Sequence, residues 1–263
     1  EQSRRFDNVY PSASFATMVA GMGVQLSYSV KTTRPTYSQL SNNVSYGNRF
    51  TMQTGNPLLN NSTRHMVSLA GGNEWLKFSL DYTNEHDAII YYAQQNPADS
   101  KVVMINHRNI ESIKSFTPAL ILSPSFGVWR PQFIGGMYKQ WLDFETIDGV
   151  QKMNAPIFSV QFNNTLVLRP DMIGEVNFVY QSPGDNQNIH LNYHVTNLDV
   201  ALTKTFFRDR LSLKVAGQDL FNRYKTGALI RAPKIDIYQL NTMDTRCVSV
   251  TLRYRFNTTD SKY

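Results

Sequence analysis

The sequence predicts an all-β fold, an antiparallel transmembrane β-barrel, and three observations lead to this prediction. Apolar and polar residues alternate along many segments, as expected of strands whose two faces meet different surroundings. Many of these segments have about ten residues or more, the length that a strand needs to cross a bilayer and longer than the ~5–6 residues usual in soluble sheets. Tight turns and longer polar loops alternate between the segments, an asymmetry typical of membrane barrels.

Eleven strands follow from this pattern when the chain is taken in order. They are expected at residues 10–19, 24–31, 64–69, 76–92, 109–122, 133–144, 157–168, 175–181, 190–206, 211–221 and 246–256. Residue types that favour turns mark the tight connections, at Gly21, Gly71, Ser123, Pro170 and Asp209. The longer polar loops are expected at residues 34–62, 93–101, 145–156, 182–188 and 222–245.

The last expected strand shows the alternation most clearly. Its even positions are all apolar or aromatic, namely Val248, Val250, Leu252, Tyr254 and Phe256. Its odd positions are small, polar or cationic, namely Cys247, Ser249, Thr251, Arg253 and Arg255. In a membrane barrel the first set would face lipid and the second a wet lumen. A soluble β-sandwich has the same period, so the alternation alone leaves both folds open.

The composition argues against a helical membrane protein and against a nucleic-acid-binding protein. Charged residues make up 17% of the chain, below the ~25% usual in globular proteins, whereas aromatic residues make up 12%. No apolar run approaches the ~18–20 residues of a membrane helix. The net charge of +6 is spread over single residues, with Arg4-Arg5 the one basic pair near the start, which argues against nucleic-acid binding. Cys247 is the single cysteine and excludes an intrachain disulfide.

The number of strands predicts that this sequence is part of a larger barrel. Bacterial single-chain barrels have an even number of strands, and eleven is odd. Residue 1 is a glutamate, and a strand pattern begins within ten residues of it. We therefore expect residues 1–257 to be the C-terminal half of an outer-membrane β-barrel, followed by a short polar tail at residues 258–263.

Several short motifs resemble a known family. Residues 34–40 (Arg-Pro-Thr-Tyr-Ser-Gln-Leu), 46–48 (Tyr-Gly-Asn) and 55–59 (Gly-Asn-Pro-Leu-Leu) occur in that order near the start. Residues 218–222 (Gln-Asp-Leu-Phe-Asn) and 252–257 (Leu-Arg-Tyr-Arg-Phe-Asn) occur near the end. Over essentially its whole length the chain resembles the TonB-dependent-receptor-like outer-membrane β-barrel family common in Bacteroidota.

The resemblance implies a function and a set of partners. Such receptors are similar to barrels of about 22 strands, so the eleven strands would be half of one. The implied function is energised uptake of a nutrient, whether a chelate, an oligosaccharide or a peptide, across the bacterial outer membrane. The implied partners are outer-membrane lipid, an N-terminal barrel half with a plug, TonB acting through that N-terminal part, and a surface lipoprotein. An outer-membrane adhesin or structural barrel, and a soluble β-sandwich binding module, remain the alternatives.

Two groups of residues are candidates for contacts inside such a receptor. Exposed aromatic and cationic side chains in the first and last long loops are candidates for ligand contact: Tyr37, Tyr46, Phe50, Tyr224, Lys225, Arg231 and Tyr238. Charged residues at the polar positions of strands are candidates for the lumen wall or for plug contacts: Asp81, Asp199, Lys214, Arg253 and Arg255.

The sequence offers little that points to an enzyme. It contains neither a Gly-x-Ser-x-Gly elbow nor a His-Glu-x-x-His motif. His190 and His194, four residues apart on one expected strand, would be about 13 Å apart, too far to share a metal; we interpret them, with Asn192, as a polar lumen stripe. We expect no catalytic residue, no metal site and no cofactor.

Overall fold

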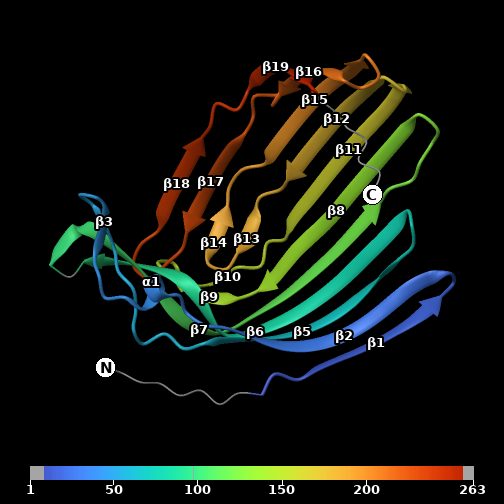
Figure 1. Ribbon diagram of the computed structural model, residues 1–263. Helices are drawn as coiled ribbons and strands as arrows, with labels where there is room; N and C mark the ends of the chain where they lie inside the picture. Colours follow the sequence, from blue (N-terminus) through green and yellow to red (C-terminus); the bar gives the residue numbers. More distant parts are fainter. Residues whose placement is uncertain (1–8, 97, 257–263) are drawn as a thin grey trace.

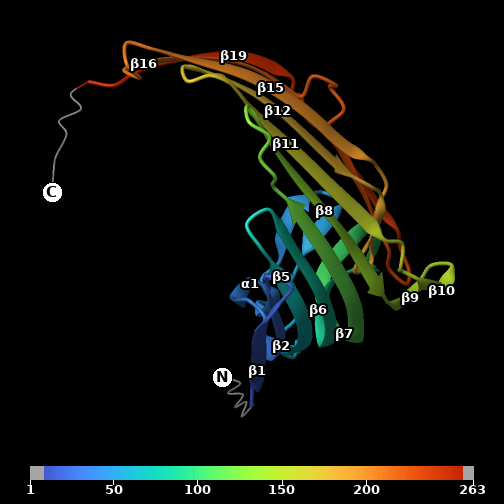
Figure 2. The same cartoon turned by 90° about the vertical axis from the view of Figure 1, so that its right-hand side faces the viewer.

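The computed structural model describes residues 9–96 and 98–256. In this part of the chain eleven long strands lie side by side in one strongly curved antiparallel sheet (Figures 1 and 2). In sheet order they are β1 (Ser12–Val19), β2 (Met22–Thr33), β5 (Ser62–Gly72), β6 (Leu76–Asn96), β7 (Asp99–Leu122), β8 (Trp129–Trp141), β11 (Ile157–Arg169), β12 (Met172–Gln181), β15 (Val195–Phe206), β16 (Leu211–Gln218) and β19 (Cys247–Tyr254). The prediction of about eleven antiparallel strands is confirmed.

The long connections hold more regular structure than the sequence predicts. Residues 34–62 contain α1 (Tyr37–Leu40), β3 (Ser45–Asn48) and β4 (Thr51–Gln53). Residues 145–156 overlap a hairpin of β9 (Asp143–Thr146) and β10 (Gly149–Lys152). A separate four-stranded sheet is formed by β13 (Gly184–Asn186), β14 (Ile189–Leu191), β17 (Lys225–Ile230) and β18 (Ile237–Thr242).

The prediction of a long loop at residues 93–101 is wrong. Strand β6 continues to Asn96 and β7 begins at Asp99, so the two strands form a hairpin that projects beyond their neighbours (Figure 1). The polar residues Gln94 and Gln95 suggested a loop, but they pair with Met104 and Val103. Backbone pairing between the two long strands therefore outweighs the polar composition of this segment.

The register gives the main sheet two chemically different faces. Across β2, β5 and β6 one row is Leu26, Leu69 and Leu80, and the next row is Ser27, Ser68 and Asp81. Across β15, β16 and β19 one row is Leu202, Val215 and Val250, and the next row is Thr203, Lys214 and Thr251. We call these two sides the apolar face and the polar face.

No second sheet covers the apolar face of the last strand in the described chain. Val250 is 68% exposed and Leu252 is 67% exposed. A β-sandwich would bury these side chains against an opposing layer, so the alternative of a soluble β-sandwich is wrong. No helix among the described residues is long and apolar enough to span a membrane.

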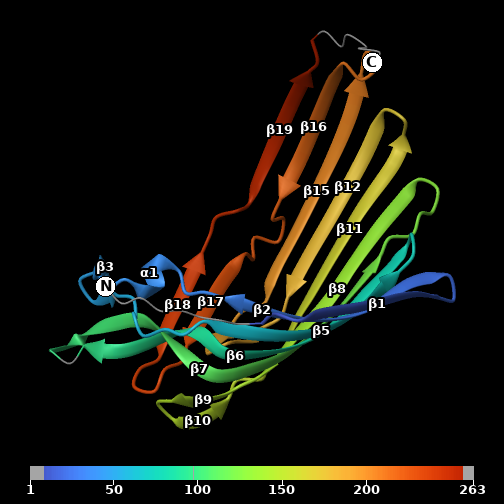
Figure 3. The same cartoon turned by 60° about the horizontal axis from the view of Figure 1, so that its bottom comes forward.

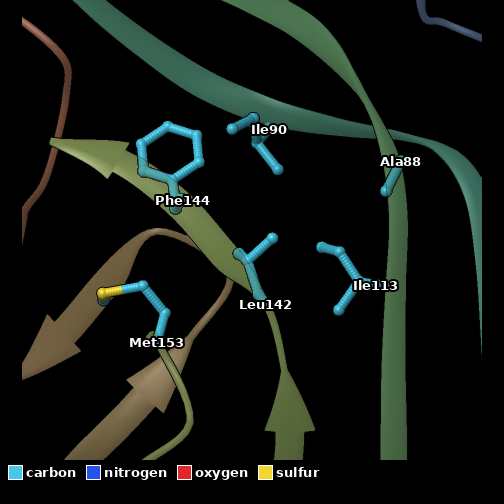
Figure 4. Packing of buried hydrophobic residues seen from close by; sticks show 6 residues of the cluster. All are labelled: Ala88, Ile90, Ile113, Leu142, Phe144 and Met153. Carbon is cyan, nitrogen blue, oxygen red and sulfur yellow. The ribbon is translucent and has the colours of Figure 1, made fainter. Parts of the chain in front are cut away.

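The main hydrophobic cluster lies where the β6–β7 hairpin leaves the sheet. Figure 4 shows its six members: Ala88, Ile90, Ile113, Leu142, Phe144 and Met153. Asp87, with φ of 52°, adopts a left-handed conformation just before Ala88 and so reverses which side chains face this cluster. The segment that precedes β9, together with β9 itself, packs on the base of the hairpin and holds it against the barrel wall.

The two ends of the sheet differ in their connections. The tight turns lie at one end, which we call the turn end, and the long connections with their extra strands lie at the other, which we call the loop end (Figure 3). Apart from the short connection between β6 and β7, this arrangement matches the alternation of short and long connections that the sequence predicts. Strands β1 and β19 are the first and last strands of the sheet. Within the described residues, each is paired along one edge, β1 with β2 and β19 with β16.

Candidate functional site: the loop end around the β6–β7 hairpin

The first loop folds back on itself through helix α1. Thr36 caps this helix reciprocally, since its Oγ1 accepts from the Gln39 N–H at 3.3 Å and its own N–H donates to Gln39 Oε1 at 2.8 Å. The N–H of Gly55 donates to the Ser41 carbonyl at 2.8 Å. A Cβ on Gly55 would lie 2.4 Å from that carbonyl oxygen, so only glycine fits this close approach.

The same loop is fastened along the free edge of β7. Strand β4 pairs in parallel with β7, and the N–H of Thr54 donates to the Ile105 carbonyl at 3.0 Å. The side-chain amide of Asn56 donates to the His107 carbonyl at 3.0 Å. The motif residues Gly55 and Asn56 therefore have a structural task, which is to hold the loop on the β6–β7 hairpin.

A cavity of about 470 Å³ lies between this loop and the hairpin. Its lining is aromatic and polar: Tyr37, Ser38, Ser41, Asn43, Ser45, Gln53, Thr54, Gly55, Tyr91, Ile105 and His107. The Tyr91 and His107 rings lie 4.8 Å apart, and Tyr37 is 84% exposed at the rim. We call this space the loop cavity.

The loop cavity has an uncharged lining at neutral pH. None of its lining residues is Asp, Glu, Lys or Arg. Burial lowers the pKa of His107, so its imidazole is neutral. Hydroxyl and amide groups next to aromatic rings can bind a neutral, hydroxyl-bearing molecule, whereas nothing in the lining would neutralise an anion.

Of the seven ligand-contact candidates, one is among the residues that line this cavity. Tyr37 lines it, whereas Tyr46 and Phe50 lie further along the same loop, 70% and 44% exposed, and do not. The guanidinium of Arg49 lies over the Phe50 ring at 4.3 Å. The sequence reasoning missed Tyr91, Asn43 and His107, because it considered only aromatic and cationic residues of the first and last long loops. Tyr91 lies in an expected strand, His107 lies just before another one, and Asn43 is neither aromatic nor cationic.

The candidates of the last loop lie on or next to β17 and β18. Tyr224 is half-buried just before β17, and Lys225 is exposed at its start. Arg231 is held by Asp236 at 3.0 Å and lies 3.6 Å from Asp148. Tyr238, 52% exposed, shares a hydrogen bond with the Tyr193 hydroxyl at 2.7 Å.

Asn188 connects the last loop to the β6–β7 hairpin. It is fully buried, and its side-chain amide donates to the Tyr91 carbonyl at 2.9 Å and to the Arg231 carbonyl at 2.7 Å. The end of β17 therefore lies against the same hairpin that carries the loop cavity. No sequence motif marks Asn188, because its two partners are 97 and 43 residues away in the chain.

The predicted lumen-wall residues Asp81, Asp199, Lys214 and Arg253 lie on the polar face. The Lys214 ammonium pairs with Glu175 at 2.6 Å, and Asp199 accepts from the Asp219 N–H at 2.9 Å. Arg255 lies beyond the end of β19, where its N–H donates to the Arg210 carbonyl at 2.8 Å. Whether these side chains contact a plug stays a prediction.

Two acidic residues of the polar face were missed. Glu175 pairs with Lys214, and Glu85 pairs with Arg64 at 2.7 Å. Both occupy the polar positions of alternating strands, which is the signal that could have identified them.

Asp219, in the motif at residues 218–222, has a structural role in the last loop. The residue is 2% exposed, and its carboxylate accepts a hydrogen bond from Thr245 Oγ1 at 2.6 Å. Its backbone has φ of 46°, at the point where β16 has ended and the last loop begins. Asp219 thus joins the two ends of this loop, which is a structural task rather than a ligand contact.

The interpretation of His190 and His194 as one lumen stripe is wrong. The expected strand at residues 190–206 is interrupted at residues 192–194, so His190 lies on β14 and His194 precedes β15. His190 Nδ1 bonds to Asp185 Oδ1 at 2.7 Å, whereas His194 Nδ1 bonds to the Tyr180 hydroxyl at 2.9 Å. The two side chains serve different local contacts. Over the described part of the chain, no three His, Cys, Asp or Glu side chains are grouped so as to hold a metal ion.

Fold and faces together define an outer-membrane β-barrel protein. The profile of the "Outer membrane protein beta-barrel family" matches residues 1–254. The chain belongs to this family, and its location is the outer membrane of a bacterial cell. No curated protein matches the sequence.

Solved structures with a similar fold are TonB-dependent siderophore receptors. The siderophore receptor PirA from Pseudomonas aeruginosa has 11% identity and a TM-score of 0.58, and the match covers 89% of this chain and 41% of that one. PirA from Acinetobacter baumannii has 14% identity and a TM-score of 0.54 over 95% and 41% of the two chains. A ferric enterobactin receptor (PfeA) mutant from P. aeruginosa, in complex with enterobactin, has 11% identity and a TM-score of 0.54 over 81% and 35%. The chain thus spans about two fifths of the length of these receptors and shares their barrel fold.

Proposed function

We propose that this chain forms part of the wall of a TonB-dependent receptor that takes up a nutrient through the outer membrane. The observation that carries the proposal is the likeness of the eleven-stranded sheet to siderophore-receptor barrels over 89% of the chain. In this proposal the apolar face, including Val248, Val250, Leu252, Tyr254 and Phe256, contacts lipid. The polar face lines the lumen, and the chain takes no direct part in any chemical reaction.

The loop end would capture the nutrient at the cell surface. The loop cavity offers a neutral, hydroxyl-bearing ligand the faces of Tyr37 and Tyr91 and the polar groups of Asn43 and Gln53. A neutral oligosaccharide fits this lining better than an anionic chelate, because the lining contains no cation. Lys225 and Arg231 on the last loop are not among the residues that line the loop cavity.

The edges of the sheet support the proposal that further strands complete the barrel. In lipid an unpaired backbone group costs several kcal/mol, so an open edge does not persist in a bilayer. We therefore expect β19 to pair with a strand upstream of this sequence, in a barrel of about 22 strands that also holds a plug through which TonB acts. A surface lipoprotein that covers the loop end would be a further partner.

This expectation has a direct test. The 263 residues alone, refolded in detergent, are expected to aggregate rather than form a barrel whose electrophoretic mobility changes on boiling. A compact, heat-modifiable monomer would show that the strands close among themselves, and the half-barrel proposal would fail.

Topology is tested by labelling single cysteines on intact cells in a Cys247→Ser background. A membrane-impermeant thiol reagent is expected to label Tyr46→Cys, on the loop end, and to leave Asp209→Cys, on the turn end, unlabelled until the cells are lysed. The reverse pattern would place the loop end in the periplasm and exclude capture from outside.

Transport is tested in cells that produce the intact protein. We expect deletion of the gene to abolish uptake of one member of a panel of oligosaccharides, peptides and ferric chelates, and we expect uptake in the parent strain to stop when TonB is deleted or the proton gradient is dissipated. If the gene instead supports attachment to surfaces and the uptake panel does not change, the adhesin alternative holds.

A further inference from the structure

The apolar face carries very few charges, and all of them are lysines. In the register of the described strands, from the turn end up to the base of the β6–β7 hairpin, its charged positions are Lys114, Lys139 and Lys204. Lys204 lies at the turn end, next to the Phe206 ring at 5.4 Å. Lys114 and Lys139 lie at the other end of the face, on the neighbouring strands β7 and β8.

These two lysines lie at the level of a membrane interface. Trp129 and Trp141 are the first and last residues of β8, both on the apolar face and 39% and 45% exposed. Twelve residues at about 3.3 Å each, tilted by about 40°, separate the two indoles by roughly 30 Å across the membrane, close to the spacing of the aromatic girdles of a barrel. Lys114 lies directly opposite Trp141, and Lys139 lies opposite Phe116.

The two lysines are therefore diagonal neighbours within one polar patch. Residues diagonal across two strands are about 7–8 Å apart, close enough for two ammonium groups to share one doubly charged anion. The row of Lys114 continues across β6 and β5 through Asn84 and His65. His86 joins this row, since its Nε2 lies 3.1 Å from Asn84 Nδ2. We call Lys114, Lys139, Asn84, His65 and His86 the interface patch.

A polar hollow adjoins the interface patch on its loop-end side. It measures about 490 Å³, and Lys114, Trp141, Lys152, Asn154, Glu111 and Asp143 are among its lining residues. The Lys139 ammonium reaches the same hollow, where it donates to the Asn154 carbonyl. The hollow thus combines cations at its membrane side with carboxylates further out, which can accept hydrogen bonds from hydroxyl groups.

We propose that the interface patch and this hollow bind a phosphorylated glycolipid of the outer leaflet. Its phosphate lies between Lys114 and Lys139, and its acyl chains run down the apolar face below them. Its sugar hydroxyls donate to Glu111 and Asp143 in the hollow. The register supports a membrane lipid rather than a soluble phosphate compound, because the lysines emerge from a surface whose remaining positions toward the turn end are apolar or aromatic on both strands, namely Phe116, Pro118, Leu120, Leu122, Trp129, Pro131, Phe133 and Met137 with Gly135 between them.

The test measures which lipid stays on the intact protein after extraction in a mild detergent, by native mass spectrometry. We expect the unmodified protein to retain a phosphorylated glycolipid, and retention to fall about fivefold for each lysine replaced, in Lys114→Gln, Lys139→Gln and the double variant. Lys204→Gln is the matched control, because it removes the third lysine of the apolar face at the turn end, and its retention is expected to be unchanged. Lys114→Arg with Lys139→Arg keeps both charges and is expected to retain the lipid.

Two measurements on the unmodified protein test the proposal even if a variant fails to assemble. Enzymatic removal of the lipid phosphates is expected to abolish retention, and raised salt concentration is expected to reduce it. Equal retention of the phosphorylated and dephosphorylated lipids, or equal retention by the double variant and Lys204→Gln, would overturn the proposal. Displacement by millimolar inorganic phosphate alone would also overturn it, since the site would then recognise a free anion rather than a lipid.

Discussion

Replacing Val250 by arginine tests the assignment of the two faces on the last strand. Val250 is 68% exposed and lies opposite Val215, so no neighbour on the sheet would neutralise a guanidinium there. It is four residues from Tyr254 at the turn end, about 13 Å along the strand and roughly 10 Å along the membrane normal after tilt. An apolar band about 25 Å tall then places Val250 near the bilayer midplane, where arginine costs about 2–4 kcal/mol.

Two neighbouring positions on the polar face are the controls. Ser249→Arg projects opposite Ala216 and is expected to cost less than about 0.5 kcal/mol. Thr251→Arg lies opposite Lys214, whose ammonium already pairs with Glu175, so repulsion adds up to about 1 kcal/mol.

The assay is urea unfolding of the intact protein in phospholipid vesicles, followed by the loss of heat-modifiable mobility. The free energy of unfolding is expected to fall substantially in the Val250→Arg variant and little in the Ser249→Arg variant. Equal losses at the two positions would refute the assignment of the faces.

Three further predictions concern the loop end. Gly55→Ala places a Cβ 2.4 Å from a backbone oxygen and is expected to speed proteolysis of the first loop on cells, whereas Gly47→Ala, with no neighbour nearer than 3.9 Å, is not. Burial lowers the pKa of His107 on β7 from 6.5, so the packing of the first loop on the β6–β7 hairpin is expected to keep its full stability above about pH 6.5 and to lose it as the pH falls toward the lower folded pKa. Hydrogen exchange of this region at pH 7.5 and 5 would show the loss, and His107→Gln is expected to remove the dependence on pH. Asp219→Ala is expected to destabilise the last loop by about 1–3 kcal/mol, read from local hydrogen exchange, while a melting temperature of the whole barrel that falls with it would contradict a local role.

The strands of the barrel wall were predictable because each side chain on them faces one of two surroundings, lipid or water. The alternation of apolar and polar residues along β19 therefore predicts which side chains share a face. The part of the β6–β7 hairpin that projects beyond the neighbouring strands does not follow this alternation. The hairpin at Gln94 and Gln95 is polar and reads as a loop, although backbone pairing continues through it.

The candidate site was predictable only in part, because it depends on contacts between distant segments. Tyr37 could be chosen as an exposed loop aromatic, and it does line the loop cavity. Its partners Tyr91 and His107 come from a hairpin that is brought there by β4 pairing with β7 and by the single side chain of Asn188. No period or composition signal reports a parallel pairing between residues about 50 positions apart.

The motif residues and the ligand-contact candidates turn out to be different sets. Gly55 and Asn56 hold the first loop on β7, and Asp219 closes the last loop on Thr245, so the recognisable motifs describe how the loops are attached. In the proposed receptor, residues that only attach a loop to the barrel would not by themselves distinguish one nutrient from another. In that proposal we expect selectivity to depend on side chains that the anchors position but that no motif includes, such as Asn43 and Tyr91 in the loop cavity. For this reason a variant of an anchor residue is expected to impair uptake of any ligand that uses the cavity, whereas Asn43→Ala or Tyr91→Ala is expected to change which ligand is preferred.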